Sequence, residues 1–274
     1  MVEASLRAAG PYSLRLTTGA ATWTARLPAA RWASAQQQYD GQIVVRASCD
    51  LAVEEARFML AVDDDTTDFH RLYARDPLIG PAVQRLRGMR PRRKATVTHA
   101  VVRAISGQLI QASRALEIER AIIRAAGEDP PTRASLAQLS PARLAACGLA
   151  TSRAVTLTRL ARVIDLDGLR ARPDAPERLG RERGVGPWTV GVIALQGLGR
   201  YDAGLVDDLG LVKLLASLCR RWPEPGETAE LLEVYGEWKG LASVFLLQGF
   251  KRGLVRGASM DRARLVRASA RAAA

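Results

Sequence analysis

Two features of this chain have residue types and spacing that suit chemistry. One is a pair of carboxylates, Asp207 and Asp208, and the other is a glycine turn, Gly184-Val185-Gly186, that precedes them. Because glycine has no Cβ, a partner can approach the backbone of such a turn closely, and N–H groups at the start of the next helix suit a phosphate. A carboxylate beside a sugar can stabilise the positive charge that develops when an N-glycosidic bond breaks. The combination favours a protein that binds nucleic acid and acts on it.

The residues around the turn favour a phosphate site. Pro187 fits the first position of the following helix, where its missing N–H costs nothing. The residues that we expect to bind a DNA phosphate, independently of base sequence, are Gly184, Val185, Gly186 and Thr189. The alternative is an ordinary tight turn between two helices.

The acidic pair also has two interpretations. Adjacent carboxylates at the start of a helix can serve as caps that the helix dipole favours. The other interpretation is that one of the two carboxylates is a reactive group.

The composition favours a polyanionic partner and excludes several kinds of site. Lys and Arg number 40 against 28 Asp and Glu, so the 274-residue chain carries a net charge of +12. An arginine-rich surface without a nucleic-acid partner is the alternative. Three cysteines without a C-x-x-C motif and two histidines exclude a four-cysteine zinc or iron–sulfur site. Without an apolar signal core or a long apolar run, we expect a cytoplasmic monomer with no membrane partner.

Hydrophobic periodicity predicts an α+β, predominantly α fold. Strand patterns occupy residues 12–16, 23–27 and 42–45, and Asp50 is the expected cap of a helix that ends at residues 63–65. Residues 85–94 form a basic linker, and helical patterns follow, ending in an apolar helix pair over 231–250 and a frayed tail after Gly257. The expected domains are an N-terminal antiparallel sheet with helices (1–75), a linker that packs with the C-terminal helices (76–94), a helical domain with the glycine turn (95–200) and a C-terminal helical domain (201–274).

These motifs resemble the helix-hairpin-helix DNA glycosylases, specifically their alkylation-repair branch, which removes 3-methyladenine-type bases. The resemblance covers roughly residues 75–252 and includes the basic linker, the segment Arg103–Ile110, the turn and the acidic pair. It implies an N-terminal antiparallel sheet domain followed by two helical subdomains. It also implies that Asp208 is catalytic, because a hydrophobic residue lies three positions later and Lys213 five positions later, as in the family. Asp207 is then the expected cap.

Trp188 bears on the type of reaction. In bifunctional members of the superfamily the residue two places after the second glycine is a lysine that attacks the sugar, and here it is Trp188. The resemblance therefore implies a monofunctional enzyme that removes a base without cutting the strand.

The resemblance also implies a pocket and a wedge. Trp188, Phe250 and Trp238 are candidates for an aromatic wall against a cationic base, although each is equally explicable as core. Leu109 matches the position of a residue that fills the gap left by a flipped base, with Gln108 beside it to contact the opposite strand; a buried leucine at a helix end is the alternative.

The expected function is excision of alkylated purines from double-stranded DNA near the nucleoid, with no organic cofactor. The resemblance implies a monovalent cation, Na⁺ or K⁺, held by the backbone of Gly180, Glu182 and Val185. The competing functions are a glycosylase for an oxidised or deaminated purine and a non-catalytic protein that binds damaged DNA.

Overall fold

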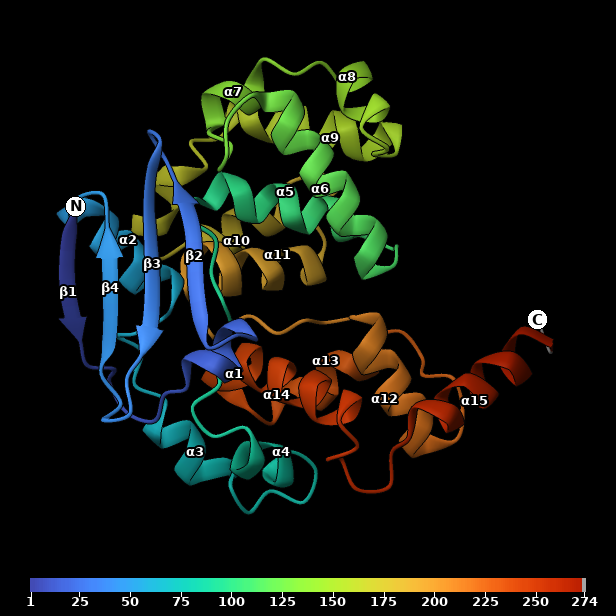
Figure 1. Ribbon diagram of the computed structural model, residues 1–274. Coiled ribbons are helices and arrows are strands. Elements are labelled where there is room, and N and C mark those ends of the chain that lie inside the picture. Colours follow the sequence, from blue (N-terminus) through green and yellow to red (C-terminus); the bar gives the residue numbers. More distant parts are fainter. Residues whose placement is uncertain (273–274) are drawn as a thin grey trace.

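The computed structural model describes residues 1–272, and its N-terminal part is a four-stranded antiparallel sheet (Figure 1). The strands are β1 (Val2–Leu6), β2 (Thr22–Leu27), β3 (Arg31–Gln37) and β4 (Ile43–Ala47), in the order β1-β4-β3-β2. Alternate residues of β4 are buried, and helix α2 (Asp50–Met59) covers this face. The expected fold class, mainly helical with an N-terminal antiparallel sheet, is confirmed.

Details of the N-terminal prediction were wrong. Residues 12–16 were expected to be a strand, but α1 (Leu14–Thr18) begins there, because the Ser13 side chain accepts a hydrogen bond from the Leu16 N–H at 3.2 Å. The strands β1 and β3 were missed, because β1 exposes alternate residues at the sheet edge and β3 carries small and polar side chains. Cys49, not Asp50, is the N-cap residue of α2.

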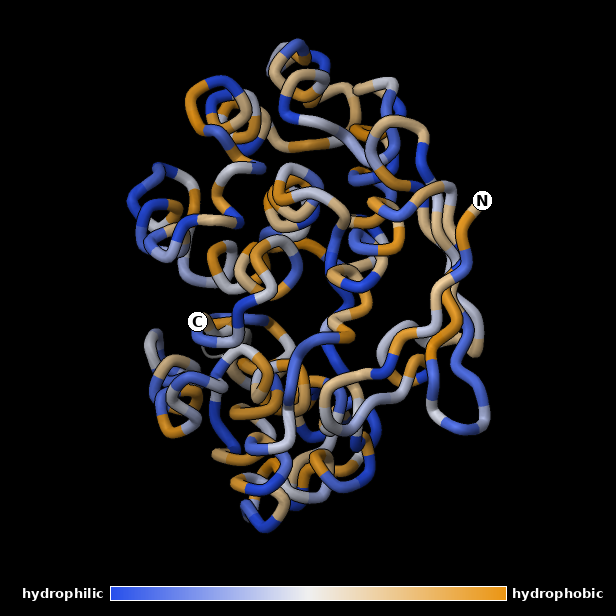
Figure 2. Tube along the Cα trace, turned by 90° about the vertical axis from the view of Figure 1, so that its left-hand side faces the viewer, coloured by the Kyte–Doolittle hydropathy of each residue, from blue (hydrophilic) through white to orange (hydrophobic). Residues whose placement is uncertain are grey.

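The helices between residues 97 and 198 form the upper lobe in Figure 1. Apolar and polar residues both occur along these helices in Figure 2, and their apolar side chains form the core. They are α5 (Val97–Gly107), α6 (Ala112–Ala126), α7 (Arg133–Ala137), α8 (Pro141–Ala146), α9 (Thr151–Val163), η1 (Asp167–Ala171), α10 (Ala175–Gly180), α11 (Pro187–Ile193) and the π-helical η2 (Ala194–Leu198).

The lower lobe combines two early helices with the C-terminal ones (Figure 1). Phe69 of α3 contacts the rings of Trp238 and Phe245, with centroids 5.8 and 5.1 Å away. Helix α3 therefore packs with the C-terminal helices, whereas the expected boundary at residue 75 placed it with the sheet. The elements are α3 (Thr67–Tyr73), α4 (Gly80–Arg85), α12 (Leu209–Cys219), α13 (Glu227–Glu233), η3 (Gly236–Trp238), α14 (Lys239–Lys251) and α15 (Met260–Ala272).

The end of the described chain is a helix, where a frayed tail was expected. Helix α15 packs on α12 through the buried Ala263, and the N–H of Ser259 donates to the Ser217 hydroxyl at 2.7 Å. The sequence did not predict this packing, because the segment has short apolar side chains and an arginine-rich composition. None of the helices in residues 1–272 combines the length and apolar character needed to cross a bilayer.

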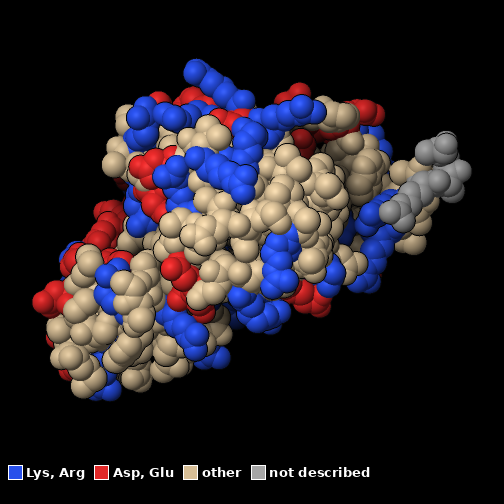
Figure 3. All heavy atoms as spheres, turned by 90° about the horizontal axis from the view of Figure 1, so that it is seen from above, with Lys and Arg blue, Asp and Glu red and all other residues tan. Residues whose placement is uncertain are grey.

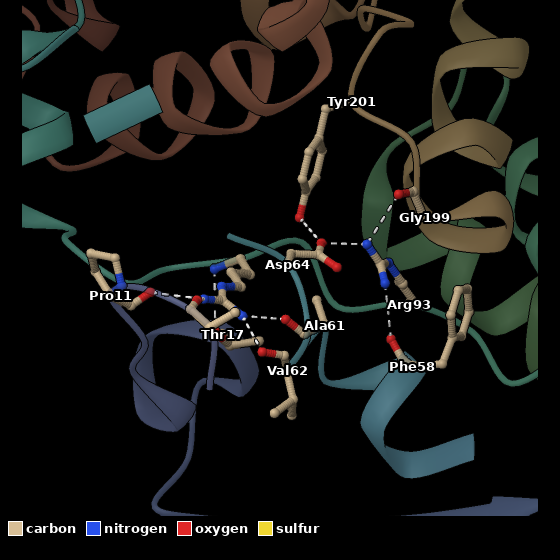
Figure 4. Close-up of polar contacts among 11 residues, drawn as sticks. Pro11, Thr17, Phe58, Ala61, Val62, Asp64, Arg93, Gly199 and Tyr201 are labelled. Carbon is tan, nitrogen blue, oxygen red and sulfur yellow. Dashed lines mark hydrogen bonds and ion pairs between the residues drawn. The ribbon is translucent and has the colours of Figure 1, made fainter. Parts of the chain in front are cut away.

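The segment expected to be a basic linker is partly buried and joins the sheet to both lobes (Figure 4). The Arg90 guanidinium donates to the carbonyl oxygens of Val62 and Pro11, each at 3.0 Å. Arg93 is paired with Asp64, which also accepts a hydrogen bond from the Tyr201 hydroxyl. Buried guanidinium groups with this many partners hold the three parts of the molecule in fixed positions.

A second buried cluster fixes α6 against α5. Glu119 of α6 is 2% exposed, and its Oε1 lies 2.6 Å from Lys94 Nζ and 2.9 Å from His99 Nε2. Arg103 Nε lies 3.6 Å from Oε2. Burial raises the pKa of Glu119, but the hydrogen bond with His99 and the charge of Lys94 outweigh it and hold the pKa at about 2. The cluster therefore stabilises the helix pair whose connecting turn carries Leu109.

The variant Glu119→Gln tests this contribution. Because the folded-state pKa lies below the ordinary value, ionised Glu119 adds stability above about pH 4.5, and this stability is lost as the pH falls toward 2. A shift of this size corresponds to about 3 kcal/mol. Urea unfolding should show a variant that is less stable than wild type at pH 7, with the difference shrinking between about pH 5 and pH 3. The exposed neighbour Glu117→Gln is the control, and a difference that does not change with pH would contradict the account.

Candidate functional site

The glycine turn lies between α10 and α11 and has the geometry expected of a hairpin. Gly184 has φ of +85°, and a Cβ there would lie 2.5 Å from Thr156 Oγ1, so both conformation and space require glycine. Gly186 is the N-cap residue of α11 and Pro187 occupies its first turn, which confirms the predicted position of the proline. Gly184 and Gly186 are exposed.

The turn between α5 and α6 is tied directly to this hairpin. The Gln108 carboxamide donates to the Gly184 carbonyl at 3.0 Å and to the Thr189 hydroxyl at 2.9 Å. The next residue, Leu109, is 96% exposed, with φ of +55°. The buried alternative for Leu109 is thereby excluded. Gln108, expected to reach toward a DNA strand, is instead bound to the hairpin and fixes where Leu109 projects.

Asp208 caps α12, and both of its carboxylate oxygens have a donor. Oδ1 accepts from the Gly210 N–H at 2.7 Å, and Oδ2 accepts from Trp188 Nε1 at 2.9 Å. The expectation that Asp207 would be the cap was wrong, because it is the Asp208 side chain that receives the N–H of the first turn. The same carboxylate is therefore both the cap and the candidate reactive group.

Asp207 has a different environment. Its φ is +61°, a left-handed conformation that is unfavourable for a residue other than glycine. Its N–H donates to the Thr228 hydroxyl at 2.9 Å, and that hydroxyl donates to the Asp207 carboxylate at 2.9 Å. Thr228 is 1% exposed and lies in α13, and nothing in the sequence indicated its contact with the acidic pair.

Trp188 connects the hairpin to Asp208. Its ring lies against Gly107 at the end of α5, where a Cβ would be 2.8 Å from Cη2. The indole N–H is thus aimed at Asp208 by packing on a residue without a side chain. Trp188 acts in this structure as a donor to the carboxylate, a role that the sequence did not indicate.

The other two aromatic candidates are packed elsewhere. Phe250 is 3% exposed and belongs to the core, so it has almost no surface to offer a ligand. Trp238 is half-buried and stacks on Tyr201, with centroids 5.9 Å apart. It lines a shallow cavity of about 230 Å³ with Tyr201, Arg200, Asp202 and Glu237.

Leu247 is the residue of α14 that reaches the first turn of α12. A Cβ at Gly210 would overlap its Cδ2 and lie 3.0 Å from Asp208 Oδ1. Leu247 precedes Phe250 by three positions and therefore lies on a neighbouring part of the helix surface. Helical spacing within 231–250 could have indicated Leu247, but the sequence prediction named only aromatic side chains as candidates for the pocket.

The hairpin also has charged neighbours. Arg159 of α9 is paired with the Glu182 carboxylate and donates to the Arg183 carbonyl at 2.7 Å. The Glu182 carbonyl accepts the Val185 N–H at 3.0 Å. Residues 1–272 contain no group of three or more His, Cys, Asp or Glu side chains suited to a metal ion.

Comparison with known proteins identifies the fold. No protein-family model matches the chain. A DNA-3-methyladenine glycosylase of Bacillus subtilis is 25% identical over 206 residues, which are 68% of this chain and 67% of that protein.

Two solved structures extend the similarity to nearly the whole chain. The structure of a 3-methyladenine DNA glycosylase from Archaeoglobus fulgidus matches with a TM-score of 0.78 and 17% identity, over 91% of this chain and 98% of that one. A Clostridium acetobutylicum 8-oxoguanine glycosylase/lyase, in complex with double-stranded DNA, matches with a TM-score of 0.72 and 17% identity, over 89% and 93%. With the hairpin, the capping aspartate and the N-terminal sheet, these similarities show that the chain has the fold of the helix-hairpin-helix DNA glycosylases.

Proposed function

We propose that this protein is a monofunctional glycosylase that removes alkylated, 3-methyladenine-type purines from double-stranded DNA. The observation that carries the proposal is the joint position of three groups. The exposed Leu109, the hairpin that binds Gln108, and the Asp208 carboxylate held by Trp188 form one connected set. The 25% identity to an enzyme named for 3-methyladenine supports the choice of substrate.

The hairpin and Leu109 supply binding and base extrusion. The exposed backbone at Gly184 and Gly186 can receive a phosphate at the start of α11, which continues into η2. Flipping a base out of the stack costs a few kcal/mol, least for a damaged base. An apolar side chain in the vacated gap offsets part of that cost, and Leu109 is available because it packs on nothing in the protein.

Asp208 supplies the chemistry. When the bond between C1′ and the base nitrogen breaks, its electron pair stays with the base, so a cationic alkylated base leaves as a neutral molecule. Positive charge then develops on the sugar, and the Asp208 carboxylate stabilises it. Water adds to C1′ and gives up a proton, which the carboxylate can accept, leaving an abasic site. Two fixed hydrogen bonds hold the carboxylate in place, so little reorganisation is needed.

The hairpin bears on two further features of the proposed enzyme, the type of reaction and a bound cation. Trp188 occupies the position of the lysine found in bifunctional relatives and has no amine to form a Schiff base, which supports a monofunctional reaction. The carbonyl oxygens of Gly180, Glu182 and Val185 are neutral donors that fit a monovalent cation and would hold it beside the bound phosphate. Na⁺ or K⁺ there would add positive charge to phosphate binding and take no part in bond cleavage.

A glycosylase for oxidised purines is the second candidate, because an 8-oxoguanine glycosylase/lyase shares the fold over most of both chains. The experiment that separates them measures which bases are released from methylated genomic DNA and from duplexes that contain 8-oxoguanine. Release of 3-methyladenine from the first, without strand cleavage, supports the proposal. Release of 8-oxoguanine alone would replace it with the second candidate.

Asp208→Asn should lower the rate of base release from methylated duplex DNA by about 10²- to 10³-fold, because it removes the charge opposite the developing cation. Asparagine still caps a helix, so the thermal midpoint should stay within a few degrees of wild type. Single-turnover release and thermal unfolding measure the two effects. A variant that binds abasic-analogue DNA normally and releases base at the wild-type rate would exclude the mechanism. It would still permit a non-catalytic role in binding damage.

Leu109→Ala should weaken binding to damaged duplex DNA more than it slows base release from a single-stranded substrate. The reason is that only the duplex requires a side chain to fill the gap in the stack. Leu72→Ala, at a 53% exposed position of α3, is the matched control. Equal effects of Leu109→Ala on both substrates would remove the wedge assignment.

A further inference from the structure

Half of the chain's net charge lies at its C-terminal end. Residues 251–274 contain seven Lys or Arg and one Asp, a net charge of +6 out of +12 for the whole protein. Within α15, Arg264 and Arg267 are three positions apart, which places them on one side of the helix. The helix packs on α12 through the buried Ala263, which borders this side.

Arg264 and Arg267 make few contacts with the rest of the protein, in contrast to Arg262. The Arg262 guanidinium donates to the Gly257 carbonyl at 2.5 Å and helps to fix the start of the helix. The Arg264 side chain is 75% exposed and has only a surface pair with Asp261, which is worth little. Arg267 lies over Trp222, with its guanidinium carbon 5.9 Å from the ring centroid.

The helix projects toward the side that carries the candidate site. Figure 1 shows the α5–α6 turn, the start of α12 and α15 on the right-hand side, with the sheet on the left. Lys and Arg atoms extend to this end of the molecule in Figure 3. A helix of 13 residues is about 20 Å long and can reach several successive phosphates, since phosphates follow one another every 3.4 Å along a strand.

We propose that the basic side of α15, defined by Arg264 and Arg267, binds the DNA backbone beside the lesion as a second contact in addition to the hairpin. The proposal rests on the proposed function in requiring that the protein binds duplex DNA. Its contacts are with phosphates, so it adds affinity without reading bases. DNA is the occupant that the charge favours, because the C-terminal end carries a net charge of +6 and its one acidic residue, Asp261, offsets only part of that charge.

The test is the salt dependence of binding to an undamaged duplex. For the double variant Arg264→Gln, Arg267→Gln, the slope of log K against log salt concentration should become shallower by about 1 to 2. The double Arg→Lys variant keeps the charges and should restore most of the slope. The control removes two exposed arginines of the sheet region, with Arg7→Gln and Arg46→Gln, and should leave the slope near wild type.

A wild-type slope in the double glutamine variant, or an equal loss in the sheet control, would overturn the proposal while leaving the glycosylase intact. A wild-type protein that binds no duplex would overturn both. Thermal unfolding of each variant separates a loss of charge from a loss of α15 packing.

A second inference rests on the contact between Thr228 and Asp207. We infer that Thr228 is a positioning residue that holds Asp207 in its left-handed conformation and so directs the following Asp208 into the site. A strained residue persists only where its surroundings fix it, and the buried hydroxyl does so through two hydrogen bonds.

Thr228→Val removes both hydrogen bonds at nearly constant volume and should slow base release about tenfold at saturating DNA, with little change in DNA affinity. Thr228→Ser should behave as wild type. Asp207→Gly added to Thr228→Val should recover most of the rate, because glycine adopts the left-handed conformation without strain. A wild-type rate in Thr228→Val, or a loss that Asp207→Gly does not recover, would overturn the assignment.

Discussion

The hydrogen bond between the Trp188 indole and the Asp208 carboxylate is the interaction on which the candidate site depends, because it joins the two lobes where they meet. Trp188 belongs to α11 of the upper lobe and Asp208 caps α12 of the lower lobe. The bond forms only because both sides allow close approach. Gly107 leaves room for the indole ring and Gly210 leaves room for Leu247 beside the carboxylate. A side chain at either glycine would displace one partner.

The rest of the fold keeps these two groups in place. The pair of Arg93 with Asp64 joins the sheet to the loop that carries Tyr201, and Glu119 joins α6 to α5. Two residues with left-handed backbone, Leu109 and Asp207, stand at the edges of the site. Such conformations cost free energy and persist where neighbours enforce them, here Gln108 bound to the hairpin and Thr228 in α13. Two of the six non-glycine residues with positive φ in residues 1–272 thus lie beside the residues proposed to act on DNA.

The parts of the site that follow from local chemistry could be predicted from the sequence. The hairpin required two glycines and a proline at fixed positions, and the position of Leu109 at a helix end followed from the motif around it. Residues that depend on long-range packing could not be assigned in this way. Leu247 lies against Gly210 in the first turn of α12, while Phe250 one turn later is in the core, because the packing of α14 on α12 decides which part of the helix faces the site. The contact of Thr228 with Asp207 likewise depends on the relative placement of α13 and α12. The packing of α15 on α12 also depends on long-range contacts, and a frayed tail was expected there.

The measurement that tests the central claim most directly is single-turnover base release by Trp188→Phe, with Trp32→Phe at an exposed sheet position as the control. Phenylalanine keeps a ring against Gly107 and removes the one donor to Asp208 Oδ2. A hydrogen bond to a charged group contributes about 1.5–3 kcal/mol, so the rate should fall about ten- to hundredfold while affinity for abasic-analogue DNA stays near wild type. A wild-type rate in Trp188→Phe, or a loss of DNA affinity in place of rate, would contradict the account.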